Sequence, residues 1–270
     1  MPAHPSSIQR LFKRLRQGGL AWAASALRER CFPHRPSFHA EACSALTGGR
    51  VLEIGGPSRL FRTRGALPVY GAADRVDNVN FSATTAWESR LQEGGAFEFR
   101  RGRQPGTQYL REAGTLHGFK DEGYDAVISS HCLEHLADPL GALNEWRRVC
   151  RNGGLLLLVL PDPRHTFDHR RPITLLEHLL ADRAAERPET DETHFAEVLA
   201  LHDLSLDPAA GSPEEFRERV HGNTTHRCVH HHVFDGALME ESLRHTGWVP
   251  IAVEAFAPLH LGALARKGTP

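Results

Sequence analysis

The sequence is poor in cysteine, with five in 270 residues, and no two of them stand at CxxC spacing. The five are odd in number and scattered along the chain: Cys31, Cys43, Cys132, Cys150 and Cys228. This pattern excludes a disulfide framework and a zinc site built on thiolates. A reducing compartment fits such a chain best, so we expect a cytoplasmic location.

The net charge is also close to zero: the chain has 32 Lys and Arg and 33 Asp and Glu, which gives −1 at pH 7. No overall field therefore attracts nucleic acid, and we expect none as a partner. No apolar run approaches the roughly 20 residues that a membrane-spanning helix needs, and we expect neither a transmembrane nor an export segment. With 40% hydrophobic residues, the chain can still bury a full core.

Residues 1–37 form a separate N-terminal region in our interpretation, amphipathic over residues 8–27. Apolar residues at helical spacing lie opposite basic ones: Ile8, Leu11, Phe12 and Leu15 against Arg10, Lys13, Arg14 and Arg16. Two interpretations stay open. One is a helix packed on its own domain, which is the commoner case. The other is a helix that lies on a membrane surface and makes the protein membrane-associated.

Residues 38–270 predict one α/β domain. We expect a helix over 38–46, strands over 50–54, 76–79, 97–100 and 124–129, a helix over 139–150 and a strand over 155–160. The last of these strands is aliphatic throughout, as in the centre of a parallel sheet covered on both faces. A helix capped by Asp235 and a strand pair over 248–256 and 260–267 close the chain. This alternation predicts a doubly wound sheet that binds ligands at the carboxyl ends of its strands.

The segment over about 161–232 interrupts the alternation. It carries three expected helices, over 174–183, 193–204 and 213–220, and many histidines and charges. We interpret it as a mainly helical insertion after the central strand, which serves as a lid or substrate subdomain.

The first strand ends in Gly55-Gly56, where the missing Cβ atoms let the backbone turn sharply and approach a ligand. Such a turn alone is common in structural loops. Asp77 follows 24 residues after Glu53, about where an acidic residue contacts ribose hydroxyls in nucleotide-binding βαβ units. Pro57-Ser58 occupies the place of a third glycine, which disfavours the rival interpretation of a nicotinamide-dependent oxidoreductase.

Several stretches resemble the class I S-adenosylmethionine-dependent methyltransferase family: 51–56 (Val-Leu-Glu-Ile-Gly-Gly), Asp77, Glu112-Ala113 with Leu116, 124–135 and 147–154. The resemblance covers roughly residues 50–161 and is most specific in 124–135, where Leu-Glu-His precedes Asp138-Pro139. It implies a Rossmann-like, mostly parallel sheet with an antiparallel last strand, and S-adenosyl-L-methionine as the cofactor. The site residues that it implies are Glu53, Gly55 and Gly56 for the amino-acid part of the cofactor, Asp77 for the ribose, Glu112 and Ala113 for the adenine edge, and Ser130 and His131 near the sulfonium.

Methyl transfer from a sulfonium is an in-line displacement, so alignment supplies much of the rate. A hydroxyl acceptor gains further from a base, and histidine suits that role near neutral pH. The candidate catalytic residues are His131, His165 and His169, and the predicted substrate-binding residues are Arg164, Asp168, Arg170 and Arg171. All but His131 lie in a polar loop past the central strand, which alternatively only anchors the insertion. We expect a small-molecule or saccharide acceptor, most simply a hydroxyl of a sugar or glycan precursor. N-methylation of another small metabolite and a catalytically inactive partner subunit remain alternatives.

Eighteen histidines are many, and four groups raise the question of a metal: Glu177-His178, His194 with Glu197, His202-Asp203 and His230-His231-His232. No HExxH or other specific ligand spacing occurs, and consecutive histidines in an extended segment point to alternate faces. We therefore expect no metal and interpret these histidines as structural or substrate-contacting. Nothing in the sequence indicates an oligomeric state.

Overall fold

The computed structural model describes residues 35–85 and 91–268, and the predictions for residues 8–27 lie outside this range. The helices are α2 (His39–Leu46), α3 (Pro139–Val149), α4 (Leu176–Ala184), α5 (Phe195–Leu201), α6 (Pro213–His221), α7 (Asn223–His226) and α8 (Gly236–His245). The strands are β1 (Arg50–Ile54), β2 (Arg75–Asn80), β3 (Ala96–Phe97), β4 (Gly106–Leu110), β5 (Tyr124–Ser130), β6 (Cys150–Pro161), β7 (Trp248–Phe256) and β8 (His260–Lys267). The short 3-10 turns Leu133–His135 and Pro163–His165 follow β5 and β6.

The strands form one eight-stranded sheet in the order β3-β4-β2-β1-β5-β6-β8-β7. β1 pairs in parallel with β2 and β5, β2 with β4, and β5 with β6. The last strand, β8, runs antiparallel to both of its neighbours. The predicted mostly parallel, Rossmann-like sheet with an antiparallel last strand is confirmed. The carboxyl ends of β1, β2, β4, β5 and β6 consequently meet at one edge.

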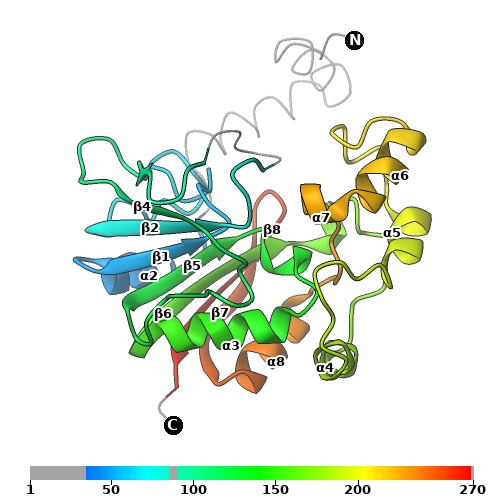
Figure 1. Cartoon of the computed structure of the whole chain (residues 1–270). Coiled ribbons are helices and arrows are strands. Elements are labelled where there is room, and N and C mark those ends of the chain that lie inside the picture. The colour runs from blue at the N-terminus through cyan, green and yellow to red at the C-terminus, as the bar shows by residue number, and fades with distance from the viewer. Residues whose placement is uncertain (1–34, 86–90, 269–270) are drawn as a thin grey trace, which may run out of the picture. The chain divides into compact units, whose positions relative to one another are not determined.

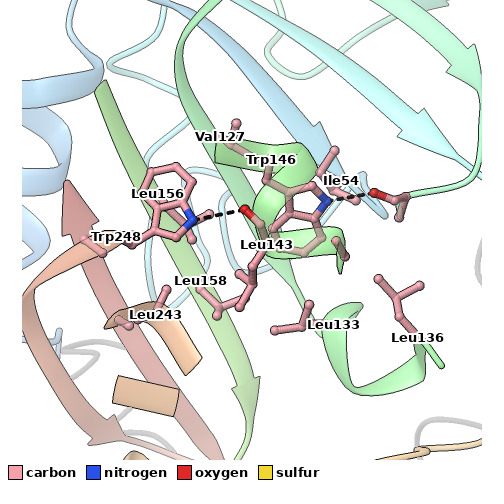
Figure 2. Packing of buried hydrophobic residues seen from close by; sticks show 14 of the residues in the cluster. Ile54, Val127, Leu133, Leu136, Leu143, Trp146, Leu156, Leu158, Leu243 and Trp248 are labelled. Atoms are coloured by element: carbon pink, nitrogen blue, oxygen red, sulfur yellow. Dashed lines mark hydrogen bonds between the residues drawn. The ribbon is translucent and has the colours of Figure 1, made fainter. Parts of the chain in front are cut away.

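Each face of the sheet carries its own apolar layer. α3 and α8 cover one face (Figure 1), and two fully buried tryptophans pack there, Trp146 of α3 and Trp248 of β7. The Trp146 indole N–H donates to the carbonyl oxygen of Ala113 at 2.9 Å, and that of Trp248 to Leu143 at 3.1 Å (Figure 2). Phe38, Ala42 and Leu46, in and just before α2, belong to the layer on the other face. The core therefore fixes α3, and through Trp146 also the backbone at Ala113, which follows β4.

The prediction of a third strand over 97–100 is wrong. Only Ala96 and Phe97 are in strand conformation, in a short antiparallel pairing with β4. The third parallel strand is β4, which pairs with β2 through the register Asn78 to Gln108. Its residues Gly-Thr-Gln-Tyr-Leu alternate little in polarity, so an apolar pattern gives almost no signal there.

The segment between β6 and α8 contains α4 to α7, which gather beyond one end of the sheet (Figure 1). A small apolar cluster joins parts of it: Phe195, Val198, Ala210, Phe216, Val220 and Val229. α6 begins with a capping box, in which Ser212 and Glu215 each accept a backbone N–H of the other. As predicted, Asp235 caps α8, by accepting the N–H of Leu238. Among residues 35–85 and 91–268, no helix combines the length and the apolar composition needed to cross a membrane.

Candidate active site

The turn after β1 is held from the neighbouring strand. Gly55 has a φ of 81°, a conformation that residues with a Cβ rarely adopt. The Gly56 N–H donates to the side-chain oxygen of Asn78 at 3.0 Å, and its carbonyl accepts the Asn80 amide at 2.8 Å. A Cβ on Gly56 would lie only 2.2 Å from the carboxyl carbon of Glu53. The two glycines are therefore required by the backbone shape and by close packing, respectively.

Glu53 lies beneath this turn and is fully buried. Its carboxylate accepts the N–H of Ser58 at 2.9 Å and the hydroxyl of Tyr70 at 2.6 Å. Burial raises the pKa of Glu53 to about 7, against the opposing effect of these two hydrogen bonds. Glu53 is not among the residues that line the pocket described next, and its hydrogen bonds are with Ser58 of the turn and with Tyr70.

A pocket opens at the carboxyl ends of β1, β2, β4 and β5, the edge that the fold class predicts for ligand binding. It encloses about 420 Å³ of space outside atoms, part of it open to solvent. Its walls are mainly apolar, with a few polar groups, as in most small-molecule sites. The lining residues are Gly55, Val79, Asn80, Phe81, Arg111, Glu112, Ala113, Cys132, His135, Leu136 and Arg227.

The structure corrects the role predicted for Asp77. This residue pairs with Leu52, two positions before the end of β1, and its carboxylate is completely buried. Arg50, Arg75, Tyr124 and the backbone N–H of Thr107 all donate to it at 2.8 to 3.1 Å. Burial opposes ionisation, but these hydrogen bonds outweigh it and lower the pKa of Asp77. A carboxylate so occupied crosslinks β1, β2, β4 and β5 and has no place for a ribose.

Asn80 is the last residue of β2, three positions beyond Asp77. It lines the pocket, and its amide nitrogen holds the carbonyl of Gly56 at 2.8 Å. Its side-chain oxygen is buried without a hydrogen-bond partner. A buried acceptor that lacks a donor is costly, at about 1–3 kcal/mol, and Asn80 is one of the residues that line the pocket.

Glu112 and Ala113 both line the pocket, as the prediction for them requires. Arg227, from the insertion, donates to Glu112 at 2.8 Å and also forms an ion pair with Glu189. The Arg227 guanidinium lies 5.0 Å from the centre of the Phe81 ring, within cation–π range. The insertion thus supplies one wall of the pocket, which sequence reasoning did not find.

Ser130 and His131, expected near the reactive centre, are not among the residues that line this pocket. His131 has a φ of 52°, and its N–H donates to Val159 of the adjacent strand β6. Its ring Nε2 is 3.0 Å from Nδ1 of His260. Burial, and then the neighbouring His260, lower the pKa of His131 to about 3, so its ring is neutral at pH 7.

His135 is the histidine that does line the pocket. Its Nδ1 lies 3.0 Å from the carbonyl oxygen of Val229 and must donate to it, since a carbonyl only accepts. This leaves Nε2 as the acceptor of the neutral ring. Burial holds the pKa of His135 well below 6.5, and His230 adds to that effect. The ring is therefore neutral throughout the physiological pH range.

The polar loop after β6 does not gather its predicted residues in one place. Asp168 and Arg171 are buried and bound to each other at 2.9 Å, and Arg171 also donates to the carbonyls of His230 and His231. The prediction that these two bind substrate is wrong, because their polar atoms hold the insertion together.

The other predicted residues of this loop, Arg164, His165, His169 and Arg170, are exposed. His169 and Arg170 both contact Asp203, at 2.9 and 2.8 Å. Arg164 forms an ion pair with Asp162, and His165 is exposed beside it. Neither His165 nor His169 lines the pocket.

Comparison with known proteins finds a match to a family model. Residues 72–158 match the family model described as a methyltransferase domain. A phosphatidylethanolamine N-methyltransferase of Cereibacter sphaeroides is 29% identical over 136 residues, which are 50% of this chain and 59% of that protein. An uncharacterised methyltransferase of Mycobacterium sp. (strain KMS) is 44% identical over 55 residues, 20% of this chain and 22% of its own length. The chain thus matches less than two thirds of the length of each of these relatives.

A solved structure with a similar arrangement is a putative methyltransferase from Bacillus halodurans. It is 13% identical, with a TM-score of 0.48 over 87% of this chain and 100% of the other. A SAM-dependent methyltransferase from Aquifex aeolicus is also 13% identical, with a TM-score of 0.45 over 89% and 92% of the two chains.

Proposed function

We propose that this chain belongs to the class I S-adenosylmethionine-dependent methyltransferase family. On that premise, it binds S-adenosyl-L-methionine in the pocket at the carboxyl ends of the strands and transfers the methyl group of this cofactor to a small polar acceptor. The observation that supports the proposal most is that Asn80 lines this pocket and that its buried side-chain oxygen has no hydrogen-bond partner. Ribose hydroxyls are donors of the kind that this oxygen lacks. The family's cofactor therefore fits the residues present.

The residues of the pocket hold and orient the cofactor in this proposal. Gly55 and Gly56 let the backbone approach the amino-acid part of the cofactor, and Asn80 accepts from the ribose. Glu112 and Ala113 border the adenine. When bound, the cofactor provides an electrophilic methyl group on a sulfonium, so the protein's task is mainly alignment. Arg227 holds Glu112 and closes the pocket from the insertion side.

A hydroxyl of a sugar or glycan precursor is the acceptor that we propose first. A neutral amine is already nucleophilic, whereas a hydroxyl must give up its proton as the new bond to carbon forms. Nε2 of His135 is a neutral acceptor next to the pocket and can take that proton. An amine is the second candidate, because the Cereibacter relative is named an N-methyltransferase.

The experiment is mass spectrometry of acceptors incubated with the enzyme and cofactor that carries an isotopic methyl group. The panel contains saccharides, small amines and phosphatidylethanolamine. Label on a saccharide hydroxyl supports the first acceptor, and label only on an amine replaces it with the second. Absence of label on every acceptor, together with no cofactor binding, contradicts the proposed function.

Substitution separates the candidate bases. We expect His135→Gln to lower kcat by about 10²-fold or more, the usual contribution of a general base, with little change in cofactor affinity. His165→Gln, at a predicted base that the structure leaves on the surface, is the matched control and should keep wild-type kcat. Equal activity of the two variants would remove His135 from the mechanism.

A further inference from the structure

Four side chains of the insertion converge on one point outside the pocket. His178 and Asp182 come from consecutive turns of α4, His194 directly precedes α5, and His232 ends the triple-histidine segment. One ligand atom from each lies within 4.8 Å of all the others. Three of the residues are buried: the exposed fraction of the side chain is 5% for Asp182, 10% for His194 and 0% for His232. We propose that these residues bind a zinc ion.

The distances fit a tetrahedral ion. Nε2 of His178 lies 2.8 Å from Nε2 of His194 and 3.1 Å from Oδ2 of Asp182. That carboxylate oxygen is 3.5 Å from Nε2 of His194 and 3.0 Å from Nε2 of His232. Ligands at about 2.0–2.1 Å from a tetrahedral zinc ion stand roughly 3.3 Å from one another. The four separations above, 2.8 to 3.5 Å, lie near this value, and the two remaining pairs of ligand atoms lie within 4.8 Å.

The donor set also selects the metal. Three imidazole nitrogens and one carboxylate oxygen in a tetrahedral arrangement suit zinc, whereas magnesium and calcium prefer oxygen ligands in larger numbers. His178 and Asp182 stand at i, i+4 on one helix face, a spacing typical of ligand pairs. Two further residues contact the proposed ligands. Arg187 lies 3.4 Å from the other oxygen of Asp182, and Asp191 lies 3.6 Å from Nδ1 of His194. Such partners orient metal ligands in known sites.

Without an ion, the hydrogen-bond donors and acceptors of these four side chains do not match well. Nε2 of His178 and Nε2 of His194 face each other at 2.8 Å, so at most one of the two can carry a proton there. Both also face the same oxygen of Asp182, which the ring of His232 already contacts. A divalent cation satisfies all four lone pairs at once.

The site connects two apolar cores. Leu179, next to His178, belongs to the main core beneath the sheet, whereas Phe195, next to His194, belongs to the small cluster of the insertion. His232 lies between Val229 of the small cluster and Phe234 of the main core. Zinc at this position would crosslink α4, the start of α5 and the triple-histidine segment, which also brings Arg227 to the pocket wall. The metal is structural in this account, with His178, half exposed, as the ligand nearest to solvent.

The test uses the full chain, purified without chelator or histidine tag. Elemental analysis should find about one zinc per chain, and replacement by Co²⁺ should give the visible absorption bands of tetrahedral cobalt with nitrogen and oxygen ligands. Chelation should lower the midpoint of thermal unfolding, and added Zn²⁺ should restore it. Much less than one zinc per chain, together with no cobalt bands, overturns the proposal.

Variants assign the ion to these residues. His178→Ala removes the most exposed ligand, so the variant should fold and should bind zinc at least tenfold more weakly. His178→Cys supplies another zinc ligand and should retain the metal. His169→Ala, which removes an exposed histidine outside the cluster, is the matched control and should bind zinc like the wild type. Equal affinity of His178→Ala and His169→Ala overturns the site even if the chain contains zinc.

Discussion

Gly56 offers the sharpest test of how the turn after β1 is built. A methyl group at this position would lie 2.2, 2.3 and 2.6 Å from the three carboxyl atoms of Glu53, far inside van der Waals contact. Glu53 cannot easily move aside, because Ser58 and Tyr70 hold its carboxylate in a fully buried position. Gly56→Ala should therefore force the turn outward.

Overpacking of this kind typically costs about 1–3 kcal/mol. For a domain of this size that corresponds to roughly 2–10 °C in the unfolding midpoint. Because the displaced turn borders the pocket, cofactor affinity should fall at least tenfold, which is about 1.4 kcal/mol. Thermal unfolding and calorimetric titration with S-adenosylhomocysteine measure the two effects on the same samples.

Gly114→Ala is the matched control, since a Cβ there meets nothing within 4 Å. It should keep both stability and affinity. A second test places Gly56→Ala in a Glu53→Ala background, where the obstructing carboxyl is gone, and the added cost should shrink below about 1 kcal/mol. If Gly56→Ala matches the wild type, or costs the same in both backgrounds, the packing argument is wrong.

Three further predictions concern the site and its support. Asn80→Ala should weaken the binding of S-adenosylhomocysteine by about 1–2 kcal/mol in calorimetry, and no loss of affinity would disprove the ribose contact. Trp146→Phe and Trp248→Phe each remove an indole N–H that donates to a backbone carbonyl in the core, and each should lower the free energy of unfolding in urea by about 1–3 kcal/mol. Only Trp146→Phe should also weaken cofactor binding, because it releases the backbone of the pocket residue Ala113. Burial raises the pKa of Glu53 from 4.5 to about 7, so the protonated carboxyl is favoured in the fold. The contribution of Glu53 to the free energy of unfolding is fully present below pH 4.5 and is lost as pH rises through about 7, which lowers stability by up to about 3 kcal/mol. In Glu53→Gln, the free energy of unfolding should decrease less between pH 5 and 8 than it does in the wild type. An unchanged slope would refute the assignment of this pH dependence to Glu53.

The sheet could be predicted from the sequence because its central strands are nearly pure aliphatic runs. Leu155 to Leu160 forms the carboxyl-terminal half of β6, and Val51 to Ile54 forms all of β1 but its first residue, as their composition indicates. The strand β4 could not be found in the same way, since Thr107 and Gln108 give it no apolar period. The edge that carries the pocket follows from the strand order and was therefore predictable.

Individual pocket residues were harder to predict, because they depend on where a strand ends. An acid was sought at the end of the second strand, and Asp77 was the acid available, but β2 continues to Asn80. A shift of three residues along a strand moves a side chain about 10 Å, from the pocket into a crosslink between strands. The polar residue nearest the end of the strand, of whatever charge, was the better signal.

Residues that reach the site from the insertion leave no local pattern. Arg227 contacts Glu112 across 115 positions of sequence, and His178 meets His232 only because α4 and the triple-histidine segment fold together. Arg171 and Asp168 were predicted to bind substrate, because they belong to a polar loop past the central strand. They are buried because each has a partner of opposite charge and polar groups of residues 230–231 complete their hydrogen bonds.

The most direct test of the account is calorimetric titration of S-adenosyl-L-methionine into the wild-type chain and into Asn80→Ala. The account predicts one binding site in the wild type and weaker binding in the variant, because the pocket at the carboxyl edge holds the cofactor through that side chain. No binding to the wild type, or equal binding to both proteins, would contradict it.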